Sequence, residues 1–422
     1  MTRYRMAFVS RRAVIALAFA GGIVAGVVHC SDPQGPIGPD GGGDGPFDKD
    51  ADLCGALSLC SGVCVDTSTS VAHCGGCGKA CATGETCVGG ACKGCASVDI
   101  DGDGDDSCKD CDDSDPLVNH AAFDVPGNGK DDDCNGTKDD VVACEGSPQS
   151  NSSFAVEYAR AMELCEPTLL KVDLVSPDDR ARQIAADWGL FKPRAGARFA
   201  AFSTGVAAAP GHTAPAPIVG QTPQLGTDFQ KKGAPYPGTL GSQSCPLPLA
   251  DPVTVNDLTS FTVTILVPSN AHSFLLDLNF LTADAPEWPC SDFDDQALVL
   301  LDSASFKGNL VVDAKGRRLG VNHGLVLALD APSLLGTGFD VIDGNGKVTG
   351  AATGWVTLRA PVTPREQITL RFHLFDSKDG IYDSQLLLDH FRWSTDVVTC
   401  PSTTSPLDDA GAGGCPGDAG KD

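Results

Sequence analysis

From Val253 onward, hydrophobic and polar residues alternate at every second position, which is the pattern of a β-strand with one buried face. The clearest apolar sets are Phe261, Val263, Ile265 and Val267; Phe274, Leu276, Leu278 and Phe280; and Ile368, Leu370, Phe372 and Leu374. Shorter apolar runs at 297–301, 310–312, 355–360 and 386–393 bring the prediction to at least seven strands. No helical pattern separates them, so we expect antiparallel sheets in a β-sandwich or jelly roll.

Helical spacing appears only before this region. One predicted helix covers 153–166, where Ser152 or Ser153 can cap the start and Pro167 prevents continuation. Its inward face consists of Phe154, Tyr158, Ala161, Met162 and Cys165. A second predicted helix runs from the cap Ser176 to Gly189, with Pro177 in its first turn and with Ile184 and Trp188 inward. Residues 196–252 are rich in Ala, Gly and Pro, which favours loops with a few short strands. The fold class is therefore mainly β, with short helices flanking the C-terminal sandwich.

The N-terminus has the features of an export signal. Several arginines precede an apolar run at 13–28 that is too short for a membrane span, which predicts a signal peptide over 1–30. Cys30 directly follows this run and resembles the lipidated cysteine of a bacterial lipobox, although His29 stands where that family has a small residue. Cleavage after Ala20 and an uncleaved anchor are the alternatives. Residues 31–53 and 398–422 are of low complexity and are predicted to be a disordered linker and tail.

The 19 cysteines indicate an oxidising compartment. Segment 54–95 has few large apolar residues and depends on cross-links for stability. The disulfide candidates are Cys54, Cys60, Cys64, Cys74, Cys77, Cys81, Cys87, Cys92, Cys95, Cys111 and Cys134. The pairs Cys74-x-x-Cys77 and Cys92-x-x-Cys95 also fit a zinc ribbon, but export favours disulfides. The segment resembles cysteine-rich modules of exported bacterial proteins, which implies a spacer or an interaction module.

The net charge of −25 excludes nucleic acid as a partner, because phosphate binding needs clustered Lys and Arg. Many of the acids gather in 96–144. Asp99, Asp101 and Asp103 stand at alternate positions, Gly104 follows, and Asp110 occupies the twelfth position. This is the ligand spacing of an EF-hand-type calcium loop, where glycine permits the tight bend.

A weaker copy of the loop follows, with Val142 in place of the closing acid. Its ligand candidates are Asp131, Asp133, Asn135 and Asp139, and we expect weaker binding there. A solvated, disordered linker is the alternative interpretation of so many acids. The glycines at both turns favour a folded metal site, as do Cys111 and Cys134, which bracket the segment between the loops.

The runs Asp112 to Pro116 and Asn128 to Gly136 resemble the MopE-type metal-binding repeat of exported bacterial proteins. The resemblance covers about forty residues and adds Asp112 to the ligand candidates. His120, Ala121, Ala122 and Asp124 depart from the usual pattern of that family. Copper, which is sometimes attributed to it, is therefore not expected, since oxygen ligands favour calcium.

Two further acidic segments follow strongly alternating strands, at 287–295 and 376–384. They resemble parts of the choice-of-anchor L domain, and the resemblance spans 150–397. That family implies a surface protein without an assigned catalytic role. Because the start of one antiparallel strand lies beside the end of its neighbour, we expect the two segments to meet in a second metal or ligand site. Its candidates are Asp294, Asp295, Asp376, Asp379 and Asp383.

The sequence thus predicts an exported, non-enzymatic protein of the cell surface or outer membrane, lipid-anchored or else secreted. Calcium would stabilise its modules, and the sandwich would bind a glycan, a protein or another surface ligand. Membrane contact is expected only through the N-terminal anchor. A secreted polysaccharide hydrolase using two carboxylates of 287–383 is the first alternative, but HExxH, GxSxG and P-loop motifs are absent from the sequence. Copper binding near His120 is the second alternative.

Overall fold

The computed structural model describes residues 57–60, 63–81, 85–94, 98–140, 144, 150–212, 255–285, 288–289, 291, 293, 295–313, 317–326, 331–340 and 350–404. The predicted signal peptide with Cys30, the predicted linker 31–53 and residues 213–254 lie outside them. The chain divides into two compact units, 1–65 and 66–422. In the first unit, β1 (Ser58–Cys60) and β2 (Val63–Val65) form an antiparallel hairpin.

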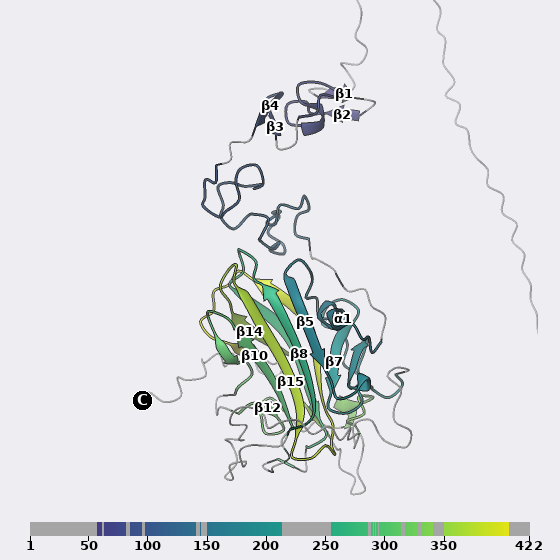
Figure 1. Cartoon of the computed structure of the whole chain (residues 1–422). Coiled ribbons are helices and arrows are strands. Elements are labelled where there is room, and N and C mark those ends of the chain that lie inside the picture. Colours follow the sequence, from purple (N-terminus) through teal and green to yellow (C-terminus); the bar gives the residue numbers. More distant parts are fainter. Residues whose placement is uncertain are drawn as a thin grey trace, which may run out of the picture. The chain divides into compact units, whose positions relative to one another are not determined.

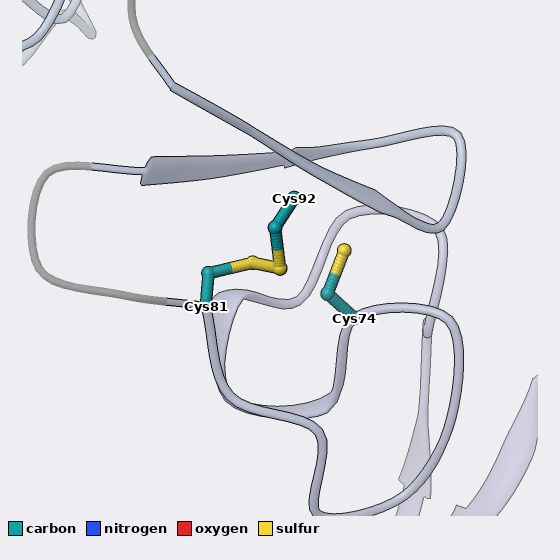
Figure 2. A group of neighbouring side chains, drawn as sticks. All are labelled: Cys74, Cys81 and Cys92. Atoms are coloured by element: carbon teal, nitrogen blue, oxygen red, sulfur yellow. A yellow bond between two sulfur atoms is a disulfide. The ribbon is translucent and has the colours of Figure 1, made fainter.

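The second unit begins with a small disulfide-bonded region. It contains the 3₁₀ turn η1 (Val71–His73) and a hairpin of β3 (Glu85–Val88) and β4 (Ala91–Gly94). Disulfides join Cys74 to Cys87 and Cys81 to Cys92, and Figure 2 shows the second bridge beside Cys74. Bonded sulfurs offer no thiolate to a metal, so the zinc-ribbon alternative is wrong for this segment.

Most of the cysteines predicted to form disulfides do so. Cys60, Cys64 and Cys77 are also bonded, whereas the candidates Cys54 and Cys95 lie outside the described residues. Farther along the chain, disulfides join Cys111 to Cys134 and Cys144 to Cys165. The prediction of an oxidised, cross-linked N-terminal region is therefore confirmed.

The predicted sandwich is present as two antiparallel sheets (Figure 1). The first has the order β11-β10-β15-β8-β5, with β12 also paired to β10. Its strands are β5 (Leu169–Val175), β8 (Val255–Leu266), β10 (Gln296–Asp302), β11 (Lys307–Asn309), β12 (Leu319–Gly320) and β15 (Gln367–Ser377).

The second sheet has the order β17-β14-β9-β16-β7-β6, with β13 also paired to β9. Its strands are β6 (Arg182–Ala185), β7 (Phe199–Ser203), β9 (Ser273–Thr282), β13 (Ala351–Ala352), β14 (Val356–Pro361), β16 (Ser384–Ser394) and β17 (Ser402–Thr404). Two short 3₁₀ turns, η2 (Asp179–Ala181) and η3 (Ala331–Leu334), connect strands.

The core follows the predicted alternation. Every inward residue named for the three long strands is at most 2% exposed, and these residues form one cluster between the sheets. Aromatic rings cross the layers at its centre, where Phe261 stacks on Phe202 at 5.1 Å and on Phe372 at 5.9 Å between ring centroids. This interlocking apolar layer holds the two sheets together.

The two helix predictions are less accurate than the strand predictions. The first predicted helix is real but short, since α1 spans Ala155–Arg160, and Phe154 is 70% exposed rather than inward. The second is wrong, because its residues form η2 and β6 instead. Ile184 and Trp188 are fully buried as expected, but strand pairing with β7 buries Ile184. Pairing with β7 therefore overrides the local capping signals that favoured a helix.

Two smaller differences concern strand ends. The run 310–312 was predicted as a strand, but the pairing with β10 uses Lys307–Asn309 just before it. In the predicted disordered tail, β17 pairs with β14, while 405–422 lie outside the described residues. Among the described residues, no helix is long and apolar enough to cross a membrane.

Candidate metal centres

The first acidic loop is folded by its own carboxylates. Asp99 accepts hydrogen bonds from the amides of Gly102 (2.6 Å) and Gly104 (3.0 Å), and both glycines have positive φ, 84° and 102°. Asp101 and Asp103 each accept a bond from the amide two residues farther on. These contacts form the tight turn that the glycine positions predicted.

Two more acids close the loop. The Oδ1 atom of Asp110 accepts the amide of Asp112 at 2.8 Å, and that of Asp113 accepts the amide of Ile100 at 3.0 Å. The Oδ2 atoms of four acids in the loop are shielded from solvent and have no hydrogen-bond partner: Asp101, Asp103, Asp110 and Asp113. Each carboxylate thus uses one oxygen for the backbone and leaves the other available.

The carboxylates of the loop form two overlapping groups. Ligand atoms of Asp101, Asp103 and Asp110 lie within 4.8 Å of one another, and so do those of Asp99, Asp101 and Asp113. Loss of hydration, together with the neighbouring carboxylates, raises the pKa of both Asp101 and Asp110. A divalent cation would relieve this repulsion, so the arrangement suits a hard ion with oxygen ligands.

The structure brings four of the predicted ligand candidates together, Asp99, Asp101, Asp103 and Asp110, and leaves a fifth apart. Asp112 is exposed, and its carboxylate accepts the Ser114 hydroxyl instead of joining the cluster. Asp113 takes its place, because its side chain bonds to Ile100 at the start of the loop. The loop spacing alone could not have revealed Asp113, which follows the twelfth position.

The second copy is arranged differently from the prediction. Of its candidates only Asp133 joins a cluster, with ligand atoms of Asp124 and Asp140 within 4.8 Å. Asp131 instead accepts the amides of Asn135 and Gly136, and Asp139 accepts the amide of Gly129. Asn135 bonds to Asp133 and Asp140, so it stands at the rim of the cluster.

Asp124 organises this second cluster. Its carboxylate accepts the amides of Asp132 (2.7 Å), Asp133 (3.2 Å) and Asp140 (2.9 Å), which draws the later acids around it. Burial and the charges of Asp124 and Asp140 raise the pKa of Asp133. Here most of the oxygens already have partners, so the site is less prepared for an ion than the first loop.

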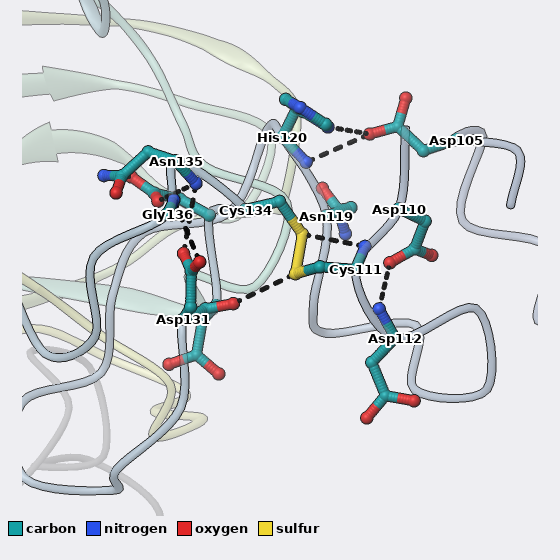
Figure 3. Close-up of a disulfide and its surroundings, with 12 residues drawn as sticks. Asp105, Asp110, Cys111, Asp112, Asn119, His120, Asp131, Cys134, Asn135 and Gly136 are labelled. Atoms are coloured by element: carbon teal, nitrogen blue, oxygen red, sulfur yellow. Dashed lines mark hydrogen bonds and ion pairs between the residues drawn. A yellow bond between two sulfur atoms is a disulfide. The ribbon is translucent and has the colours of Figure 1, made fainter. Parts of the chain in front are cut away.

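A disulfide joins the two halves of the acidic region. Figure 3 shows Cys111 bonded to Cys134, with the Asp110 and Asp131 segments on either side. The same view shows His120 directed at Asp105, to which its ring nitrogen lies at 3.5 Å. The two cysteine sulfurs are bonded to each other and Nδ1 of His120 lies beside Asp105, so most of the nearby donors that remain are oxygens.

The acidic region is also attached to the sandwich, at the turn between β8 and β9. Asn270 exchanges two hydrogen bonds with the backbone of Phe123, at 2.8 and 3.0 Å. Ser269 bonds through its amide to Ala121 and through its hydroxyl to the buried Asn119. The position of the region is thus set by specific polar contacts.

The predicted acids of the sandwich meet in part. Asp295, Asp376 and Asp383 are buried, 3%, 1% and 0% exposed, at one end of the two sheets. Asp379 is half-buried, and its carbonyl accepts the Asn256 amide. Asp294 lies outside the described residues, as does Glu287 of the hydrolase alternative.

Two histidines in the strands, His373 and His390, have structural partners. The ring of His373 bonds to the Ser260 hydroxyl at 2.9 Å, and the ring of His390 bonds to Asp277 at 3.2 Å. Burial lowers the pKa of His373 to about 4, so this imidazole is neutral at physiological pH.

Comparison with known proteins supports a metal site in the acidic region. Residues 110–140 match the family model Cu-binding MopE, described as a "putative metal-binding motif". The match begins at the closing acid of the first loop and includes the Cys111–Cys134 bridge and the Asp124 cluster. No curated protein and no solved structure matches the chain. The many disulfides and the MopE-type motif are consistent with an exported protein.

Proposed function

We propose that this chain is an exported, non-enzymatic surface protein in which calcium stabilises the acidic region and the sandwich recognises a ligand on another surface. The proposal rests chiefly on two observations in the first loop: the unpaired, shielded Oδ2 atoms of Asp101, Asp103, Asp110 and Asp113, and the two overlapping groups of neighbouring carboxylates to which these acids belong. Carboxylate oxygens are the ligands that calcium prefers, and shielded ones are costly without a cation.

The donor chemistry favours calcium over copper. Copper sites in proteins favour imidazole and sulfur ligands, but the disulfide between Cys111 and Cys134 leaves no thiolate there, and His120 is a single imidazole whose Nδ1 lies beside Asp105. The oxygens that remain suit calcium, which is abundant outside cells. Weak affinity, about 10⁻⁴ to 10⁻³ M, is expected for an extracellular module.

The recognition role draws on the resemblance to the choice-of-anchor L domain and on the burial of the sandwich acids. Among the hydrolase candidates that the structure describes, Asp295, Asp376 and Asp383 are at most 3% exposed. A polysaccharide cannot reach such carboxylates, whereas paired-carboxylate hydrolysis needs both groups beside the glycosidic bond. Binding without catalysis is therefore the better-supported function.

Metal analysis of the full-length chain, purified from an oxidising compartment, tests the metal assignment. We expect calcium to bind and copper to bind no more tightly to the chain than to its His120→Ala variant. A calcium-dependent signal in a screen of glycans and cell surfaces would support recognition. Tight copper binding that is lost in His120→Ala would overturn the calcium assignment.

Anchoring through Cys30 belongs to the same proposal and has its own test. The Cys30→Ser variant should move from the membrane fraction to the medium or periplasm, because one residue supplies the lipid attachment. An unchanged distribution would indicate that the chain is secreted or is held by its uncleaved N-terminus.

A further inference from the structure

A cavity of about 200 Å³ lies where the acidic region meets the sandwich. Both parts belong to the second compact unit, and hydrogen bonds fix them to each other, among them the bond from the Arg365 guanidinium to the Asp103 carbonyl at 2.6 Å. The walls of the cavity come from three stretches of the chain, 120–140, 163–168 and 391–393. A cavity of about 150 Å³ can hold a benzene molecule, so this one has room for a single side chain of a partner.

One wall of the cavity is acidic. It contains Asp124, Asp133 and Asp140, whose ligand atoms lie within 4.8 Å of one another. Among the described residues, no lysine, arginine or histidine bonds to these three carboxylates. Glu163 adds a carboxylate from the sandwich side, where it accepts the amide of His390 at 2.8 Å. The cavity therefore favours a positively charged group.

The other walls are aromatic. Phe123, Phe391 and Trp393 line them, and the one arginine of the lining, Arg392, lies 3.6 Å from the buried carboxylate of Asp277, which offsets its charge. A guanidinium is planar, so it can stack on an aromatic ring and also bond to a carboxylate through two donors. An arginine side chain therefore matches both kinds of wall.

A second cavity, of about 340 Å³, adjoins the first. Four residues line both cavities and so stand between them: His120, Ala122, Pro167 and Thr168. Most of the lining of the second cavity is apolar, and it includes Leu266 at the end of β8, which is 42% exposed. An extended peptide directs alternate side chains to the same side, so one short segment can fill two neighbouring cavities.

We propose that the two cavities bind an extended segment of a partner protein that carries an arginine and, two residues away, an apolar side chain. The arginine enters the acidic cavity, and the apolar side chain covers Leu266. This inference rests on the proposed role in recognition and names the class of partner. The acidic region would then contribute directly to recognition, because it forms one side of the binding site.

The probe is the blocked pentapeptide Leu-Gly-Arg-Gly-Leu, which offers the apolar side chain on either side of the arginine. It is titrated into the full-length chain by calorimetry in calcium, because the acidic region is proposed to need that ion. We expect a dissociation constant of about 0.1 to 1 mM. Binding should be roughly fivefold weaker or more when glutamine replaces the arginine or serines replace both leucines. If free arginine binds as tightly as the pentapeptide, the ligand is a small cation and the proposed partner is wrong.

Two variants locate the peptide in the two cavities. Glu163→Gln should reduce the preference for arginine over glutamine by about threefold and leave the preference for leucine over serine unchanged. Leu266→Ala should do the reverse. Asp173→Asn, at an exposed position of β5 outside both cavities, is the control and should bind all three peptides like the parent chain. Equal effects of all three variants on every peptide would place the binding elsewhere and overturn the proposal.

The outcome is separable from that of the proposed function. If none of the peptides binds in calcium, or if all three bind equally, the peptide site is wrong, whereas binding in the screen of glycans and cell surfaces would still support recognition. Pentapeptide binding that is equally tight in calcium and in chelator would support the peptide site and contradict the stabilisation of the acidic region by calcium.

Discussion

The acidic region and the β-sandwich are stabilised by different kinds of interaction. The sandwich buries an apolar layer between two sheets, whereas residues 98–140 contain no helix or strand and few buried apolar side chains. In the acidic region, carboxylates bond to backbone amides and a disulfide closes the chain. The sandwich is stabilised by burial alone, whereas the acidic region is stabilised by a disulfide and, as proposed above, by a cation.

This difference shows what each kind of sequence can encode. Alternating apolar residues specify a fold through burial, which tolerates many substitutions of similar volume. A run of aspartates specifies a fold only when each carboxylate has a defined partner. The two regions should therefore fail under different perturbations.

Removing a ring from the sandwich core should have the largest effect. Phe261→Ala deletes a fully buried ring that stacks on Phe202 and Phe372, which typically costs about 3–5 kcal/mol. Urea unfolding followed by tryptophan fluorescence measures the loss. Leu266→Ala, at a 42% exposed position of the same strand, is the control and should change stability little. Equal effects would contradict the assigned core.

Opening the Cys111–Cys134 bridge should act on the acidic region alone. Replacing both cysteines by serine frees a loop with a sequence separation of 23 and should cost the region about 3 kcal/mol. Limited proteolysis should then cut within 98–140, while the Tm of the sandwich changes little. A large fall in the Tm of the sandwich would show that the stability of the sandwich depends on this disulfide, contrary to the expectation.

Acid should weaken the sandwich through Asp277. Burial alone would raise the pKa of this carboxyl, but bonds from His390, Thr357 and Arg194, together with the charge of Arg392, lower it to about 2. A lowered pKa gives stability that is present above about pH 4 and is lost as the pH falls toward 2, amounting to roughly 2 kcal/mol. Unfolding of Asp277→Asn should lack this part of the pH dependence between pH 5 and 2.

The smallest effect compares two adjacent acids. Asp113→Asn removes one of the convergent oxygens and should weaken calcium binding about tenfold, a change of about 1.4 kcal/mol. Asp112→Asn is the matched control, because that side chain is exposed and outside the cluster. Isothermal titration of both variants decides between the ligand set of the structure and the one read from the sequence.

The sandwich could be predicted because its signal is local and repeated. In β8 and β15 every second residue is apolar and burial alternates along most of each strand, whereas β9 has the same apolar alternation but is buried along almost its whole length. The segment that forms β6 could not be predicted, because its caps and spacing suit a helix and only the neighbouring β7 decides its pairing. No element was predicted for 169–175, which becomes β5 at the edge of its sheet.

The candidate metal ligands divide in the same manner. Asp101, Asp103 and Asp110 follow a fixed spacing within one loop, so the sequence identified them. Asp113, Asp124 and Asp140 enter their clusters through contacts between separate segments, which spacing does not encode. The meeting of Asp295 with Asp376 was foreseen because antiparallel pairing fixes which strand ends are adjacent.

Hydrogen exchange of the full-length chain, with calcium and with chelator, tests the central claim most directly. The account predicts that amides of 98–140 are protected in calcium and lose that protection with chelator, while β8, β9 and β15 stay protected in both. The amides of Gly102 and Gly104, which bond to Asp99, should show the change most clearly. Equal protection of 98–140 with and without calcium would contradict the claim that a cation folds the acidic region.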